Sequence, residues 1–380
     1  MAEAGTMAGT VPERQAQRLR ASAALAYPFT PPLPGDSVVA VAPGILWARI
    51  AMPMALDHIN VYLLRDGAGW TAVDTGLNTP ASRAAWEHLA ATHLQGLPIQ
   101  RLICTHSHYD HAGQAAWMVE RFGAQLCMSY GEYFMLRGFY GPPPDPLPPL
   151  QQRFYRRAGM TDTQIEHMFS SLRRDPFMPP VPESYQRLRD GDVLQIGPRA
   201  WRVVVGEGHS PEHVCLYHSQ GDEHILIAGD QLLPRITSNV LLTHVEPEGD
   251  PLRLWLASLD RLGGLHPDSL VLPSHQSVFR GLHARVAELH THHQQQFALL
   301  RTALQKHPGA TAWHLMQAQF PQRRHAMDDL LAMGETLAHL SCLRCQGQIR
   351  RALDDDGLYR FHLADASAAP AEALSETHHE

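Results

Sequence analysis

Seven residues that follow the apolar run Leu102-Ile103-Cys104 decide the fold, and they read Thr105-His106-Ser107-His108-Tyr109-Asp110-His111. In an extended or turning backbone, residues two apart project to the same side, so His106 and His108 can bind one ion together. Asp110 and His111 fall where the chain is expected to turn into a helix, and they can hold a second ion. Imidazole and carboxylate are the usual ligands of zinc. The stretch therefore predicts a metal site at a strand end rather than a histidine-rich surface loop.

The composition is that of a globular protein with a sizeable core, because 44% of the 380 residues are hydrophobic and 18% are charged. The formal net charge is −7 and no Lys/Arg-rich block appears, which disfavours nucleic acid as a partner. The five cysteines form an odd and sparse set, so we expect no disulfide framework and a cytoplasmic location. The N-terminal 25 residues lack an unbroken apolar run, and we expect no membrane association.

The pattern along the chain predicts two sets of short strands, each followed by helices. This arrangement indicates an α+β fold, an αββα sandwich of two similar halves with the site at the strand ends. A Pro-rich stretch interrupts the pattern and carries two helical segments. We expect it to be an insertion that forms part of the substrate wall. The predicted organisation is a flexible lead-in at 1–37, a catalytic domain at 38–306 with the insertion at about 129–185, a winged-helix-like domain at 307–364 and a disordered tail at 365–380.

Three later strand-like runs also lead into a candidate ligand. The run ending at Val205 is followed by His209, the run ending at Ala228 by Asp230, and Leu270-Val271-Leu272 by His275. These residues lie far apart in the sequence, yet each closes a strand.

Taken together, these motifs resemble the metallo-β-lactamase superfamily over roughly residues 38–280. The resemblance implies a first metal held by His106, His108 and His209. It implies a second metal held by Asp110, His111 and His275, with Asp230 bridging both. The implied cofactor is two Zn²⁺ per chain, with iron or manganese as alternatives.

Further motifs indicate which subgroup of the superfamily the sequence resembles. Asp74, in Val73-Asp74-Thr75-Gly76, matches the family's aspartate that supports the His106 loop. True zinc β-lactamases lack the bridging aspartate that Asp230 supplies here. The stretch Gly208-His209-Ser210-Pro211-Glu212-His213 is similar to the G-H-T-P-G-H stretch of glyoxalase II enzymes, with Ser210 and Glu212 as departures. The C-terminal part resembles the winged-helix appendage of lactamase-like hydrolases, and the glutathione-binding basic residues of glyoxalase II have no clear counterpart.

A metal pair of this kind predicts a hydrolase. Two divalent ions lower the pKa of a bridging water, and the resulting hydroxide can attack a carbonyl without a serine or cysteine nucleophile. Asp110 and Asp230 are the expected catalytic carboxylates, and either Asp110 or a metal-bound water can deliver the proton to the leaving group. We therefore expect a small ester or thioester substrate similar to acyl-CoA or acyl-glutathione.

Two other classes of function remain open. The same metal pair serves phosphoryl chemistry, so a phosphodiesterase or RNA nuclease is the first alternative. A scaffold or regulator without metal, acting through the winged helix, is the second. Three aspartates occupy the expected wing tip at 354–356 and would repel phosphate, which favours packing or a homodimer for this domain.

Several side chains are secondary candidates. His213 and Glu212 lie beside a ligand, and we expect them either to support the ligands or to stabilise a turn or cap a helix. Possible substrate contacts are Arg235, Asn239 and a tyrosine of the insertion, Tyr133 above all among Tyr130, Tyr133, Tyr140 and Tyr155. A solvated helix surface is expected for three further histidines, His290, His292 and His293.

Overall fold

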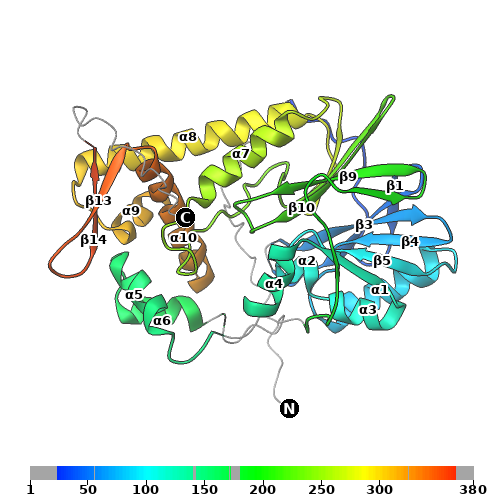
Figure 1. The fold of residues 1–380 in the computed structure, drawn as a ribbon, viewed down its shortest axis with the longest axis horizontal. Coiled ribbons are helices and arrows are strands. Elements are labelled where there is room, and N and C mark those ends of the chain that lie inside the picture. Colours follow the sequence, from blue (N-terminus) through cyan, green and yellow to red (C-terminus); the bar gives the residue numbers. More distant parts are fainter. Residues whose placement is uncertain are drawn as a thin grey trace, which may run out of the picture.

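The computed structural model describes residues 24–54, 56–139, 143–170, 172, 180–323 and 325–364. Two β-sheets stack face to face and helices cover their outer faces, as Figure 1 shows with α1 and α3 on one side and α7 and α8 on the other. This arrangement confirms the predicted αββα sandwich. Among the described residues, no helix combines the length and apolarity needed to cross a membrane.

The first sheet has seven strands that pair in sequence order. The first four are antiparallel, and the last three continue in parallel from β4. Parallel pairing brings successive strand ends to one edge, where β4 and β5 deliver Asp74 and the histidine cluster. The strands are β1 (Val38–Ala42), β2 (Ile45–Ala51), β3 (His58–Asp66), β4 (Gly69–Val73), β5 (Ile99–Ile103), β6 (Gln125–Met128) and β7 (Gln186–Arg187).

The second sheet has five strands in the order β12-β11-β10-β9-β8. Its strands are antiparallel except for the β11–β12 pair, so each sheet passes from antiparallel to parallel pairing as the chain proceeds. The two halves therefore resemble each other in pairing pattern. The strands are β8 (Val193–Ile196), β9 (Arg199–Gly206), β10 (His213–Gln220), β11 (Glu223–Gly229) and β12 (Leu270–Pro273).

An apolar core fills the space between the sheets, and fully buried Trp47 and Trp201 contribute from opposite sides. Outside the first sheet lie α1 (Pro80–His93) and α3 (Ala115–Phe122). Helix α1 begins where it does because Thr79 accepts a hydrogen bond from the Ser82 N–H at 3.1 Å and Pro80 starts the helix. Outside the second sheet lie α7 (Pro251–Gly263) and α8 (Leu282–Lys306).

The insertion packs against the C-terminal unit. Its helices α5 (Pro149–Arg157) and α6 (Asp162–Ser170) share one apolar core with α8, α9 (Ala312–Gln319) and α10 (Ala326–Cys345). The Trp313 N–H donates to the Ala158 carbonyl at 2.8 Å, and Arg157 donates to the Tyr359 hydroxyl at 3.1 Å. The hairpin of β13 (Ile349–Leu353) and β14 (Tyr359–Leu363) completes the unit. Helices followed by a hairpin are found in the order that the sequence predicts, while the assignment of this unit as a winged helix stays a prediction.

The structure corrects the expectation of solvated side chains for two histidines and adds two helices. His292 and His293 are buried, not solvated, and His293 Nδ1 lies 3.1 Å from His339 Nε2 on α10. Burial lowers the pKa of His292 to about 4, so its imidazole stays neutral. His290 pairs with Asp260 at 2.9 Å. Two helices were not expected from the sequence, α4 (Tyr130–Phe139) at the start of the insertion and α7.

The chain ends are described only in part. Residues 24–37 of the expected flexible lead-in are packed, since Leu25 is buried and Ala26 pairs with Arg280 in an antiparallel bridge. Residues 1–23, the expected tail at 365–380 and Tyr140 lie outside the described residues.

Replacing Gly159 tests the packing of the insertion on the C-terminal unit. Gly159 has φ +96°, and an added Cβ would lie 2.5 Å from Thr311 Oγ1 and 2.7 Å from its Cβ. Gly191 has φ +82° with open space around it and is the matched control. We expect Gly159→Ala to lower the free energy of unfolding by about 1–3 kcal/mol more than Gly191→Ala, because only the former adds a collision to the backbone strain. Urea unfolding of both variants measures the difference, and equal losses would contradict the contact.

Candidate metal centre

The residues predicted to bind metal converge at one edge of the sandwich. His106 and His108 lie on the loop after β5, and the four-residue helix α2 (Tyr109–Ala112) carries Asp110 and His111. The loop after β9, the end of β11 and the end of β12 supply the others, which are His209, Asp230 and His275. Backbone hydrogen bonds join the two sheets here, from the Val214 N–H to the Thr105 carbonyl and from the Asn60 N–H to the Ser274 carbonyl, both 2.7 Å.

Three imidazoles form the first group of ligand atoms. His106 Nε2 lies 2.8 Å from His108 Nδ1 and 3.2 Å from His209 Nε2. Nitrogen lone pairs that face each other at such distances repel unless a proton or a cation lies between them. All three ligand atoms lie within 4.8 Å of one another, which fits one ion.

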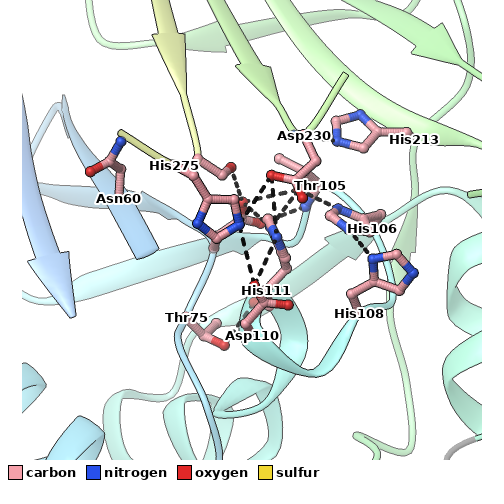
Figure 2. Close-up of polar contacts among 12 residues, drawn as sticks. Asn60, Thr75, Thr105, His106, His108, Asp110, His111, His213, Asp230 and His275 are labelled. Atoms are coloured by element: carbon pink, nitrogen blue, oxygen red, sulfur yellow. Dashed lines mark hydrogen bonds and ion pairs between the residues drawn. The ribbon is translucent and has the colours of Figure 1, made fainter. Parts of the chain in front are cut away.

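The second group is built from two imidazoles and two carboxylates, as Figure 2 shows. His275 Nε2 lies 3.3 Å from Asp110 Oδ2 and 3.4 Å from Asp230 Oδ1. His111 Nε2 lies 3.5 Å and 3.6 Å from the same two oxygens. The other oxygen of Asp230, Oδ2, lies 3.6 Å from His209 Nε2 in the first group. One carboxylate therefore faces both groups.

The donor set fits a pair of divalent cations. His111 Nε2 and Asp230 Oδ1 are fully buried and have no hydrogen-bond partner, which is costly unless an ion takes their lone pairs. The far nitrogens are fixed, since Nδ1 of His209 donates to the Asn239 carbonyl at 2.7 Å and Nδ1 of His275 donates to the His58 carbonyl at 3.0 Å. Both rings then keep the Nε2 lone pair for the centre, as metal-binding histidines do.

The charges of the site also suit a cation. Burial lowers the pKa of His108 to about 3, which leaves this imidazole neutral and able to coordinate. Burial lowers the pKa of His275 as well, but the carboxylates of Asp230 and Asp110 outweigh it and raise the pKa to about 10. Burial raises the pKa of Asp110, but His111 and His275 outweigh it and hold the pKa at about 2. Without metal, protons on the imidazoles balance the two carboxylates, and a cation competes with them for the same lone pairs.

Asp74, which the sequence predicts to support the His106 loop, lies buried beside this centre. Its buried carboxylate accepts hydrogen bonds from the Thr105 N–H at 2.8 Å, the Thr105 hydroxyl at 3.0 Å and Nδ1 of His111 at 2.9 Å. The Ser274 hydroxyl donates to it at 3.2 Å, so one side chain joins the loops after β4, β5 and β12. Asp74 has φ +62°, a left-handed conformation that a non-glycine residue holds only where its surroundings fix it.

His213 and Asn60 hold neighbouring segments. His213, predicted to support the ligands, is buried and its Nε2 accepts the Asp230 N–H at 3.1 Å, a contact that places the carboxylate. Sequence reasoning missed Asn60, whose side-chain amide donates to the Pro273 carbonyl at 2.8 Å and so fixes the segment before His275. The signal available in the sequence was a polar residue at this position in a largely apolar strand.

The possible substrate residues lie in three different settings. Tyr133 is buried, and its hydroxyl donates to the carbonyls of Pro182 and Glu183, both at 2.9 Å, so it packs within the insertion. Asn239 is exposed and positions His209 through its backbone carbonyl. Arg235 is exposed at the rim, with its guanidinium over the Tyr27 ring. Substrate contacts at Tyr133, Arg235 and Asn239 stay predictions.

Comparisons with known proteins identify the family. The pattern of the metallo-beta-lactamase superfamily matches residues 54–275, more than half of the chain. The chain belongs to the metallo-beta-lactamase superfamily. The pattern of the metallo-beta-lactamase-like C-terminal domain matches residues 291–364.

Two similar proteins cover most of this chain, and a third covers about a third of it. A crystal structure of a beta-lactamase domain protein from Burkholderia ambifaria is 40% identical, with a TM-score of 0.81 over 90% of this chain and 98% of its own. The probable metallo-hydrolase YqjP of Bacillus subtilis is 25% identical over 83% of this chain and 97% of its length. A hydroxyacylglutathione hydrolase of Hydrogenovibrio crunogenus is 26% identical over 35% of this chain and 44% of its length. The family and these relatives support a metal-dependent hydrolase.

Substituting Asp74 tests its support of the centre. Asparagine keeps the shape but offers one acceptor oxygen, so either the Thr105 N–H or Nδ1 of His111 faces an amide donor. We expect Asp74→Asn to weaken metal binding by about 10–100-fold, measured by competition with a chromogenic chelator. Asp66→Asn is the control, because Asp66 accepts from the Thr71 hydroxyl at 2.8 Å at the other end of the same sheet. Unchanged metal affinity in Asp74→Asn would show that the buried contacts do not position ligands.

Proposed function

We propose that this protein is a dinuclear metal-dependent hydrolase that cleaves a small ester or thioester. We further propose that it holds two zinc ions, one at His106, His108 and His209 and the other at Asp110, His111 and His275. Iron or manganese would fit the same nitrogen and oxygen donors. A pair of divalent cations supplies an activated water and a Lewis acid for the scissile carbonyl.

The observation that carries the proposal is the placement of Asp230. Its Oδ1 lies 3.4 Å from His275 Nε2 while its Oδ2 lies 3.6 Å from His209 Nε2. Each oxygen therefore faces a different group of imidazoles, which is the geometry expected of a carboxylate shared by two cations. A single-ion site would leave one of these groups without a partner.

The residues at the centre also define how a substrate is handled. Two dications carry four positive charges, of which Asp110 and Asp230 neutralise two, so the surplus favours a substrate that becomes negative as it reacts. Side-chain exposure is 14% for Asp110, against 1% for His275. Asp110 is also slightly more exposed than Asp230, at 11%, and either Asp110 or a metal-bound water would deliver the proton to a leaving thiolate or alkoxide.

The substrate class is supported by the chemistry of the chain as a whole. The net charge of −7 disfavours a polyanion such as RNA. The acidic turn at 354–356 in the C-terminal hairpin points the same way, because its carboxylates would repel phosphate. One partial match is a hydroxyacylglutathione hydrolase, and the Gly208–His213 stretch is similar to that enzyme class. A carbonyl thioester is therefore favoured over a phosphodiester.

Metal removal tests the reaction class. We expect about two divalent ions per chain, loss of hydrolysis after dialysis against a chelator, and its recovery on adding Zn²⁺. Mass-spectrometric metal analysis and thioester hydrolysis measured on the same samples provide the readout. Full activity in metal-free protein would refute the proposal.

Asp230→Ala tests the shared carboxylate. We expect this variant to retain at most one ion and to lose more than about 100-fold in kcat/KM, since even supporting contacts to metal ligands are worth 10–100-fold. Asp222→Ala, which removes an exposed aspartate from the turn before β11, is the matched control and should behave as wild type. Acyl-CoA, acyl-glutathione, lactone and single-stranded RNA substrates compared at one salt concentration identify the class. Faster turnover of RNA than of any acyl compound would replace the thioesterase assignment by a nuclease.

A further inference from the structure

The helix that the sequence did not predict, α4, carries a carboxylate that no sequence motif singles out. Glu132 is completely buried and lies beside the first group of imidazoles. We propose that Glu132 is a positioning residue for the His106, His108 and His209 group, as Asp74 is for His111. The inference rests on the proposed dinuclear function.

Each oxygen of Glu132 binds one of the two loops that supply this group. Oε2 accepts the N–H of Ser107, the residue between His106 and His108, at 2.9 Å. Oε1 accepts the N–H of Glu212, three residues after His209, at 2.8 Å. One carboxylate thus sets the separation of two loops that come from opposite sheets, and with it the separation of the imidazoles.

The contacts are not those of a local helix cap. The partners of Glu132 lie 25 and 80 residues away in the sequence, whereas a capping side chain binds amides of its own first turn. The N-terminus of α4 is bound by a different residue, because the Glu212 carboxylate accepts the Gly131 N–H at 2.9 Å. This also gives a role to Glu212, which stands where glyoxalase II enzymes usually have glycine.

A second set of contacts makes the link between α4 and the His209 loop reciprocal. The Ser129 hydroxyl donates to the Glu212 carbonyl at 2.7 Å, so Glu212 is held through its N–H, its carbonyl and its carboxylate. A residue held through two backbone atoms and its side chain has little freedom to shift when an ion binds. The loop is therefore preorganised, which keeps the entropy cost out of metal binding.

Asp74 and Glu132 support different parts of the centre, because their carboxylates accept hydrogen bonds from different donors. Asp74 binds Nδ1 of His111 and the Ser274 hydroxyl, next to His275, and it also accepts the N–H of Thr105, next to His106, so it acts on both groups. Glu132 binds the amide between His106 and His108 and the amide of Glu212, so it acts on the first group. Loss of Glu132 should then weaken the first ion more than the second.

Glu132→Gln is the direct test. Glutamine retains one acceptor oxygen, and its NH₂ group must face one of the two backbone N–H donors. We expect about 10–100-fold weaker binding of the ion in the first group, with the other ion changed less than about threefold. Metal-free protein is titrated with Co²⁺ against a competing chelator, and the visible absorption bands report each site. His209→Ala and His275→Ala, which each remove one ligand, assign the bands.

Glu223→Gln is the matched control. The Glu223 carboxylate also accepts two hydrogen bonds, from Arg199 at 2.9 and 2.7 Å, but it lies at the opposite end of β11 from Asp230. It should bind both ions as wild type does. If metal-free Glu132→Gln fails to fold, judged by its thermal unfolding, Glu132→Asp replaces it. Its shorter side chain reaches only one of the two loops, so the same selective weakening is expected.

The outcomes separate this inference from the proposed function. Two tight ions in wild type with unchanged binding in the Glu132 variants, or equal weakening of both ions, would overturn the positioning role and leave the hydrolase assignment standing. Fewer than two ions in wild type would overturn the dinuclear assignment itself. Selective weakening of the first ion in the Glu132 variants supports the inference.

Discussion

The buried carboxylate of Asp74 is the contact on which the rest of the centre depends. It lies in a left-handed backbone conformation and accepts hydrogen bonds from Thr105, His111 and Ser274. A buried anion is tolerated only where donors surround it, so the three segments must come together or the charge is left unsatisfied. The ends of β4, β5 and β12 are therefore positioned by one electrostatic requirement, and the sandwich provides the rigid strands that satisfy it.

The sequence predicted the parts of the structure whose signals are local. Strand ends followed by His, Asp or both located all seven candidate ligands, because a strand terminus fixes where the next side chain points. Asp74 was found through a motif, and the αββα arrangement through the order of strands and helices. The contacts of Glu132 could not be predicted in this way, since its partners are 25 and 80 residues distant and two glycines, Gly131 and Gly138, obscure the helical pattern of α4.

The error over His293 has a different origin. His293 falls four residues after Leu289 and four before Phe297, so the helical period places it on the apolar stripe of α8. The polar character of histidine favours a solvated side chain, whereas its position in the helix predicts a buried one. Burial lowers the pKa of His293 well below its usual value, which keeps the ring neutral, and a neutral imidazole can pack in a core when a neighbour such as His339 shares a hydrogen bond.

The order of the ligands along the chain has a consequence for how the protein matures. The seven candidate ligands extend from His106 to His275, and the backbone bonds that close the centre join Thr105 to Val214 and Asn60 to Ser274. Such distant pairings form late, because each must overcome the entropy of closing a long loop. During synthesis the His106 loop leaves the ribosome well before its partners do. Nascent chains would thus expose a partial chelate of four side chains, and selective metal loading must wait for the second sheet to dock.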